Sequence, residues 1–166
     1  MPDSIRRHFR TKRQSITGHQ RARLENNICK LLHQLLSEHP VEAMVGIYAA
    51  FDGEPDISKW VRETSCQIAL PKISESDTRM SFHVITAEDG EYQQVQNKFG
   101  IMEPDREAPL VEPQALEVIL IPLVAFDEQG MRMGMGAGYY DRFLPHAVNA
   151  IRVGVAFDCQ CSDDPL

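Results

Sequence analysis

The 166-residue sequence predicts a three-layer α/β fold, with a mostly parallel sheet flanked by helices, as a single domain over residues 1–166. Two observations lead to this prediction. Short apolar runs, of the kind that is buried on both faces of a parallel sheet, recur from residue 43 onward. Segments with helical periodicity lie before and between these runs, and such alternation is typical of a parallel sheet covered by helices.

Two helices are predicted near the N-terminus. The first covers residues 4–15. Thr17 and Gln20 have the spacing of a capping box, which marks the start of the second helix. We expect this second helix to end at Pro40. Its apolar stripe follows the 3.6-residue period and consists of Leu24, Ile28, Leu31, Leu32, Leu35 and Leu36.

The first predicted strand covers residues 43–50, and the turn-rich residues 52–55 follow it. Asp56 is suited to cap a short helix that contains Trp60 and Val61. The strongest strand signal is the apolar run of residues 118–126. The other predicted strands cover residues 67–70, 80–85 and 152–157.

Composition and charge argue against several classes of protein. A hydrophobic content of 43% and a charged content of 25% are ordinary for a globular domain. The net charge of −7 argues against general nucleic-acid binding. No apolar stretch reaches the roughly 20 residues of a membrane span, so we expect no membrane partner. The unpaired cysteines fit a cytoplasmic location. The cysteines have no paired spacing and are interpreted as reduced structural thiols, namely Cys29, Cys66, Cys159 and Cys161.

The positive charge is concentrated at the N-terminus, because seven of the 17 lysines and arginines precede Leu24. Two interpretations of this basic arm stay open. It is either a solvated helix face, or one or two of its side chains reach a phosphate group.

Two polar loops, residues 51–56 and 127–141, follow predicted strand ends, where parallel sheets bind their ligands. In the second loop Gly134, Gly136 and Gly138 alternate with other residues, which lets several backbone N–H groups surround one anion. The helix expected directly after them adds the field of its N-terminus. The spacing matches neither a Walker loop nor the dinucleotide fingerprint. A flexible loop whose glycines allow tight helix–strand packing is the alternative.

Two side chains of this loop suit a metal–nucleotide complex. Arg132 can neutralise phosphate oxygens with a bidentate pair of N–H groups. Asp141 offers a hard oxygen ligand, of the kind that Mg²⁺ combines with substrate phosphates. The loop therefore favours an enzyme that uses ATP.

The same loop resembles the signature of a known family. Residues 122–127, Pro-Leu-Val-Ala-Phe-Asp, followed by the alternating glycines and Tyr139-Tyr140-Asp141, are similar to the signature of 5-formyltetrahydrofolate cyclo-ligases, also called 5,10-methenyltetrahydrofolate synthetases. Residues 51–56 and 98–104 resemble two further elements of that family, and the likeness covers nearly the whole chain. It implies a Rossmann-like fold, similar to the sugar-phosphate isomerase and CoA-transferase scaffold.

The resemblance implies a reaction in which 5-formyltetrahydrofolate, with or without a polyglutamate tail, becomes 5,10-methenyltetrahydrofolate. ATP and Mg²⁺ would be required, and ADP and phosphate would be released. The γ-phosphoryl group would pass to the formyl oxygen, N10 of the folate would attack the formyl carbon, and phosphate would leave. Such chemistry depends on positioning and charge stabilisation more than on a covalent nucleophile. A monomer is expected.

The resemblance also implies roles for single residues. Arg132 and Tyr139 would be catalytic, and Asp141 would bind magnesium. Glu54 would accept hydrogen bonds from the pterin ring, with Ala49 as an apolar contact. The ATP site would consist of Arg6, Arg132, Met133, Gly134, Met135, Gly136, Ala137, Gly138, Tyr139 and Tyr140. The folate would also border Met135, Gly136, Ala137, Gly138 and Tyr139.

Structural alternatives stay open for several of these residues. Glu54 is alternatively a carboxylate at a helix start, and Arg6 a solvated side chain. Only one of Tyr139 and Tyr140 is expected to face the ligand, because neighbouring residues on a helix point in different directions. Trp60 is a candidate for stacking on a flat ring, but we expect it to pack in the core.

The sequence departs from the family pattern near both ends. The family often has a Lys or Arg a few residues before the position of Arg6, where this chain has Pro2 or Asp3. The family usually continues into a tail with an acidic residue near the metal, and we expect this chain to lack that tail. The alternative function is therefore a folate- or nucleotide-binding protein with weak or no turnover. A more remote alternative is a relative of sugar-phosphate isomerases or acyl-CoA transferases.

Overall fold

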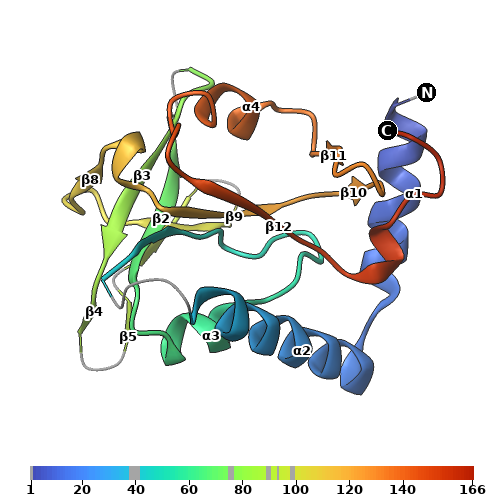
Figure 1. Ribbon diagram of the computed structural model, residues 1–166, viewed down its shortest axis with the longest axis horizontal. Coiled ribbons are helices and arrows are strands. Elements are labelled where there is room, and N and C mark those ends of the chain that lie inside the picture. The colour runs from blue at the N-terminus through green and yellow to red at the C-terminus, as the bar shows by residue number, and fades with distance from the viewer. Residues whose placement is uncertain (1, 38–41, 75–76, 89–90, 93, 98–99) are drawn as a thin grey trace.

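The computed structural model describes residues 2–37, 42–74, 77–88, 91–92, 94–97 and 100–166. Its centre is a six-stranded sheet in the order β12-β9-β1-β2-β3-β8 (Figure 1). The first four strands in this order are parallel, whereas β3 is antiparallel to β2 and β8 is antiparallel to β3. The predicted α/β class with a mostly parallel sheet is confirmed. The strands are β1 (Met44–Gly46), β2 (Gln67–Ile73), β3 (Met80–Ile85), β8 (Leu110–Val111), β9 (Val118–Pro122) and β12 (Ile151–Val155).

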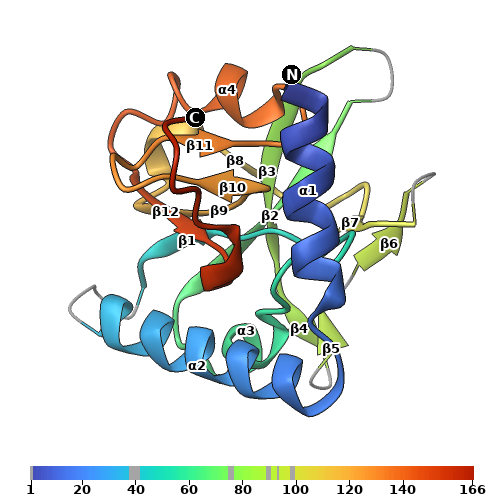
Figure 2. The same cartoon turned by 90° about the vertical axis from the view of Figure 1, so that its right-hand side faces the viewer.

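Helices cover both faces of the sheet and so form three layers (Figure 1). α2 (Gly18–Leu36) and α3 (Ser58–Glu63) lie on one face, and α4 (Tyr139–Phe143) lies on the other. α1 (Pro2–Ser15) runs across the end of the sheet, beside the C-terminal segment with η2 (Asp158–Gln160) (Figure 2). The smaller elements are β4 (Ala87–Glu88), β5 (Glu91–Tyr92), β6 (Gln94–Gln96), β7 (Met102–Pro104), η1 (Pro113–Ala115), β10 (Ala125–Phe126) and β11 (Arg132–Met133).

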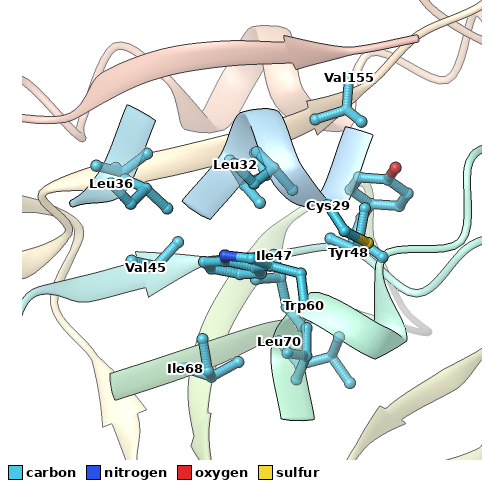
Figure 3. Packing of buried hydrophobic residues seen from close by; sticks show 14 of the residues in the cluster. Cys29, Leu32, Leu36, Val45, Ile47, Tyr48, Trp60, Ile68, Leu70 and Val155 are labelled. Atoms are coloured by element: carbon cyan, nitrogen blue, oxygen red, sulfur yellow. The ribbon is translucent and has the colours of Figure 1, made fainter. Parts of the chain in front are cut away.

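Strand β9 is apolar at successive positions because both of its faces are buried. Val118 and Leu120 belong to an apolar cluster with α2 and α3, whereas Ile119 and Ile121 belong to a second cluster with α4. Figure 3 shows the first cluster, in which the fully buried Trp60 lies among aliphatic side chains. Burial of each such side chain contributes roughly 1.5–3 kcal/mol. Trp60 is therefore a core residue, as predicted.

The buried face of α2 is narrower than the predicted stripe. Cys29, Leu32 and Leu36 are buried, but the side chains of Leu31 and Leu35 are exposed. Successive residues of a helix are rotated by about 100°, so Leu31 and Leu35 lie beside the buried face and not on it. They line an open groove along the edge strand β12.

The start of α2 also differs from the prediction. Thr17 is the N-cap residue, but its side chain makes no capping hydrogen bond, so the predicted capping box is wrong. Gly18, the first helical residue, has a left-handed φ of 55°, and the chain therefore does not enter the helix along the path that a capping box requires. The predicted end at Pro40 lies outside the described residues.

The predicted strand 118–126 is in fact two strands, because the chain breaks at Leu123 and Val124 between β9 and β10. Side chains satisfy the carbonyl groups at this break. Arg13 Nη1 donates to the Leu123 carbonyl at 3.0 Å, and Gln160 Nε2 donates to both carbonyls at 2.7 and 3.0 Å. The apolar pattern continues through the break, so the sequence did not show it.

Other strand boundaries moved by a few residues. β2 continues through Ile73 and not only to residue 70, because β3 pairs with it along this stretch. Within the predicted strand 43–50, only Met44–Gly46 is regular, and the last strand begins one residue earlier than predicted, at Ile151.

Two further observations concern the helices and thiols. Among the helices of the described residues, none is both long and apolar enough to cross a membrane. All four cysteines are free thiols, and Cys29 is buried.

Candidate active site

A cavity of about 610 Å³ lies at the carboxyl ends of β1 and β9. Phe51 and Glu54, from the loop after β1, form one part of its wall, and residues 132–141 form another. The two loops that the sequence indicated therefore meet. Every residue predicted to bind ATP, folate or metal lines this cavity, namely Arg6, Ala49, Glu54, Arg132, Met133, Gly134, Met135, Gly136, Ala137, Gly138, Tyr139, Tyr140 and Asp141.

Two of the three alternating glycines take conformations that other residues rarely adopt. Gly136 and Gly138 have φ values of 99° and 71°, in the left-handed region. A Cβ atom on Gly138 would lie 2.8 Å from Arg142 Nη1, and one on Gly136 would lie 3.5 Å from Arg6 Cζ. These neighbours are arginine side chains and not core residues. Tight helix–strand packing therefore does not explain the glycines.

Helix α1 brings Arg6 onto the glycine loop. Arg6 Nε donates to the Gly134 carbonyl at 3.1 Å, and Nη1 donates to the Asp3 carboxylate at 2.9 Å. The guanidinium thus lies on the cavity wall, and its side chain is only 27% exposed. Arg6 is therefore more than a solvated residue of the basic arm.

The residues predicted for phosphate and metal form an ion pair with each other. Arg132 Nη2 donates to Asp141 Oδ1 at 2.6 Å, and the guanidinium lies over the Tyr140 ring, 6.0 Å from its centroid. The Asp141 side chain is 71% exposed. An ion pair with one partner in water contributes little, about 0–1 kcal/mol. Both groups can therefore exchange this contact for stronger partners.

Tyr139 and Tyr140 both line the cavity, although Tyr140 also packs against the core. The expectation that only one of them faces the ligand stays a prediction. Both residues can line the cavity because the cavity meets the N-terminal end of α4, where consecutive residues are exposed to it, and not one side of the helix. Arg142 stacks on Tyr139, with 5.6 Å to the ring centroid. Tyr140 packs on the core cluster that includes Phe143, and burial raises the pKa of its hydroxyl.

Glu54 is a buried carboxylate, only 7% exposed. Its Oε2 accepts the N–H of Phe51 at 3.1 Å, and Oε1 lies 3.8 Å from Arg13 Nη2. Burial raises the pKa of Glu54 to about 7, although the Phe51 N–H and the Arg13 charge act in the opposite direction. Asp56, not Glu54, is the carboxylate next to the start of α3, because it accepts the Ser58 N–H at 2.8 Å. The structural alternative for Glu54 is therefore wrong. Asp56 itself is not the predicted N-cap, since Ile57 occupies that position.

Arg13 is one of two residues of the site whose role sequence reasoning missed. Its side chain is fully buried, and it joins three segments of the site. Nε donates to the Asp52 carbonyl at 3.0 Å, Nη2 to the Asp52 carboxylate at 3.2 Å, and Nη1 to the Leu123 carbonyl at 3.0 Å. Nη2 also lies 3.9 Å from the sulfur of Met135. The guanidinium thereby fixes the loop with Glu54 relative to the glycine loop.

Asp127 fixes the beginning of the glycine loop and was also missed. Its Oδ1 accepts the N–H groups of Met131 at 2.9 Å and Gln129 at 3.0 Å, and Oδ2 accepts that of Leu166 at 3.0 Å. These hydrogen bonds hold the pKa of Asp127 below its usual range, and the bond from the Leu166 N–H has the largest effect. The available signal was an Asp at a strand end shortly before Gly130, a pattern typical of turns.

Within the described residues, no three His, Cys, Asp or Glu side chains form a cluster that would hold a metal ion. A magnesium site does not need such a cluster, because Mg²⁺ usually takes one or two carboxylates together with phosphates and water. The exposed Asp141 carboxylate, beside Arg132 on the cavity wall, fits this donor set.

Comparison with known proteins identifies the family. A model of the 5-formyltetrahydrofolate cyclo-ligase family matches residues 2–164. A 5-formyltetrahydrofolate cyclo-ligase of Haemophilus influenzae is 31% identical over 162 residues, which cover 94% of this chain and 85% of that protein. The chain belongs to the 5-formyltetrahydrofolate cyclo-ligase family.

Solved structures agree with a cyclo-ligase fold. The NMR structure of Aquifex aeolicus 5,10-methenyltetrahydrofolate synthetase matches with a TM-score of 0.82 and 30% identity, covering 96% of this chain and 79% of that one. A 5,10-methenyltetrahydrofolate synthetase of Mycoplasma pneumoniae gives a TM-score of 0.77 over 99% of this chain and 90% of that one. At 22% identity, this second likeness concerns the fold alone. The predicted family, enzyme class and fold are thus confirmed.

Replacement of Arg13 by Met should lower the free energy of unfolding by about 3 kcal/mol, because buried carboxylates would lose a shared cation. Arg10→Met is the matched control, since Arg10 also bonds Asp52, at 2.6 Å, but is 42% exposed. It should cost less than about 1 kcal/mol. Urea unfolding followed by circular dichroism measures both. Equal losses would contradict the role given to Arg13.

Glu54→Gln should change how stability depends on pH. The pKa of Glu54 in the folded state, about 7, lies above its ordinary value of 4.5, so the folded state binds more protons between these pH values. Raising the pH through this range therefore destabilises the wild type, by up to about 3 kcal/mol at pH 8. The variant lacks this loss. The free energy of unfolding of the variant, measured with urea, should therefore increase relative to that of the wild type from pH 5 to pH 8. A constant difference between the two proteins over this pH range would contradict the raised pKa.

Proposed function

We propose that this cyclo-ligase converts 5-formyltetrahydrofolate into 5,10-methenyltetrahydrofolate with ATP and Mg²⁺, and that it releases ADP and phosphate. The observation that carries the proposal is the shared cavity. One part of its wall is the glycine loop with Arg132 and Asp141, and another is the buried carboxylate of Glu54. These two parts suit the phosphates of a nucleotide and the N–H donors of a pterin ring.

The proposed phosphate side of the cavity combines backbone groups with exchangeable charges. Arg132 would release Asp141 and take up γ-phosphate oxygens, which bind guanidinium groups in a bidentate manner. Asp141 would then be available for Mg²⁺, which supplies neutralisation of the phosphate charge. Arg6, already bonded to Gly134, would add a second cation. Such a site promotes phosphoryl transfer by position and electrostatics.

The proposed folate side of the cavity is apolar apart from its carboxylates. Glu54 would accept hydrogen bonds from the aminopyrimidine edge of the pterin. Phe51, which is 43% exposed, and Ala49 lie on the same cavity and offer apolar surface to a flat ring. Tyr139 would border both ligands, since it follows the glycine loop directly.

The proposed bond changes require no covalent nucleophile from the protein. The γ-phosphoryl group passes to the formyl oxygen and ADP leaves. The lone pair of N10 then attacks the formyl carbon and closes a five-membered ring. N10 loses its proton, and phosphate leaves with the former formyl oxygen. In this proposal Arg132 and Tyr139 are the catalytic residues, and they act by holding the γ-phosphate beside the formyl group.

Incubation of the purified protein with 5-formyltetrahydrofolate, ATP and Mg²⁺ should produce the near-ultraviolet absorbance of methenyltetrahydrofolate and an equal amount of ADP. Omission of ATP, or chelation of the metal, should abolish both products. Binding of both ligands without either product would favour a binding protein without turnover. Failure to bind ATP would show that the assignment of the glycine loop is wrong.

Asp141→Ala should reduce kcat/KM for Mg-ATP by roughly 100-fold, because the metal loses its carboxylate ligand. Folate affinity, measured by calorimetry, should change little. Asp158→Ala is the matched control, since Asp158 is an exposed acidic residue in the first turn of η2 and lies outside the cavity. An equal loss of ATP use and folate binding would indicate a folding defect and contradict a metal-specific role.

A further inference from the structure

A second carboxylate, that of Glu103 in β7, lines the cavity and has no role in the scheme above. Glu103 is only 8% exposed, and Ile73, Ile101 and Met102 lie on the same cavity wall. No Lys, Arg or His of the described residues forms an ion pair with it. Burial of a carboxylate among apolar side chains is unfavourable unless hydrogen-bond donors reach it.

Only one of the two Glu103 oxygens has donors within the described part of the chain. Oε1 accepts the N–H of Ile73 at 3.2 Å and Nδ2 of Asn97 at 2.9 Å. Oε2 accepts no hydrogen bond from a described residue. Glu54 likewise keeps an acceptor for a ligand, because its Oε2 accepts the Phe51 N–H while Oε1 lies 3.8 Å from Arg13 Nη2 and accepts no hydrogen bond from a described residue. Since no described residue donates to Oε2 of Glu103, this oxygen suits an N–H donor of the ligand.

The proposed substrate has a donor that fits. The 2-amino group and N3–H of its pterin form one pair of donors, which suits a carboxylate such as Glu54. The remaining ring donor is N8–H, which exists only when the second ring is reduced. In folic acid, N8 carries no hydrogen and is an acceptor. A carboxylate placed against N8 would attract the reduced ring and repel the oxidised one.

We propose that Glu103 Oε2 accepts the N8–H of the folate and makes the cavity selective for reduced folates. The topology supports this assignment. Ile73, which holds Glu103, is the last residue of β2, and β2 is the neighbour of β1, whose following loop carries Glu54. Glu103 of β7 is therefore held at the carboxyl end of β2, beside the strand whose following loop carries Glu54, and both side chains line the same cavity. This inference rests on the proposed function, because it names a contact of the same substrate.

Glu103→Gln separates the ligand contact from the structural contacts. The glutamine oxygen still accepts from Ile73 and Asn97, whereas an NH₂ group takes the place of Oε2. Affinity for 5-formyltetrahydrofolate, measured by calorimetry, should fall about 10- to 100-fold, as expected for loss of a hydrogen bond to a charged group. Affinity for folic acid should stay the same or rise, since the amide can donate to N8. Affinity for Mg-ATP should not change, which also shows that the variant is folded.

Glu107→Gln is the control, because it makes the same chemical change four residues later on an exposed side chain outside the cavity. It should leave all three affinities unchanged. The proposal would be overturned if the Glu103→Gln variant bound 5-formyltetrahydrofolate as tightly as the wild type does. It would also be overturned if the variant lost affinity for 5-formyltetrahydrofolate and for folic acid by the same factor. A wild-type protein that binds neither folate would refute the proposed function itself, which is a different result.

Discussion

The buried guanidinium of Arg13 is the constraint on which the geometry of the site depends. Its charge has no contact with solvent, so protein groups must satisfy its N–H donors. They come from the turn at Asp52, from the break between β9 and β10 at Leu123, and, as a weaker contact, from Met135. Helix α1 therefore cannot shift without disturbing both loops of the cavity, and the two ends of the cavity keep a fixed relation to each other.

The charged groups of the cavity differ in how firmly they are held. Glu54 is buried, and this burial raises its pKa because the ionised carboxylate loses contact with water. Arg132 and Asp141 are paired near the surface, where an ion pair exchanges partners at little cost. A rigid carboxylate suits recognition of a ring with fixed donors. An exchangeable pair suits a nucleotide whose charge changes during the reaction.

The sequence predicted the fold well and the site in part, for physical reasons. Features that depend on neighbouring residues could be predicted, because glycine spacing and apolar runs act locally on the backbone. The loop that contains Gly136 was identified in this way. Features that depend on contacts distant in sequence were not. The break at Leu123 requires Arg13 and Gln160, and the groove beside Leu31 depends on which face of α2 meets the sheet. The roles of the cavity residues, the monomeric state, the cytoplasmic location and the absence of a family tail stay predictions.

The basic arm shows what a closer analysis of charge periodicity reveals. Arg6, Arg10 and Arg13 are spaced by four and three residues, so they share one face of α1. Arg6 bonds the glycine loop, while Arg10 and Arg13 bond the Asp52 carboxylate. One helix face thus supplies cations both to the proposed nucleotide side and to the support of Glu54. A stripe of arginines at helical spacing on an acidic protein is therefore a signal for a buried or ligand-facing surface, because solvation alone does not require the charges to be aligned.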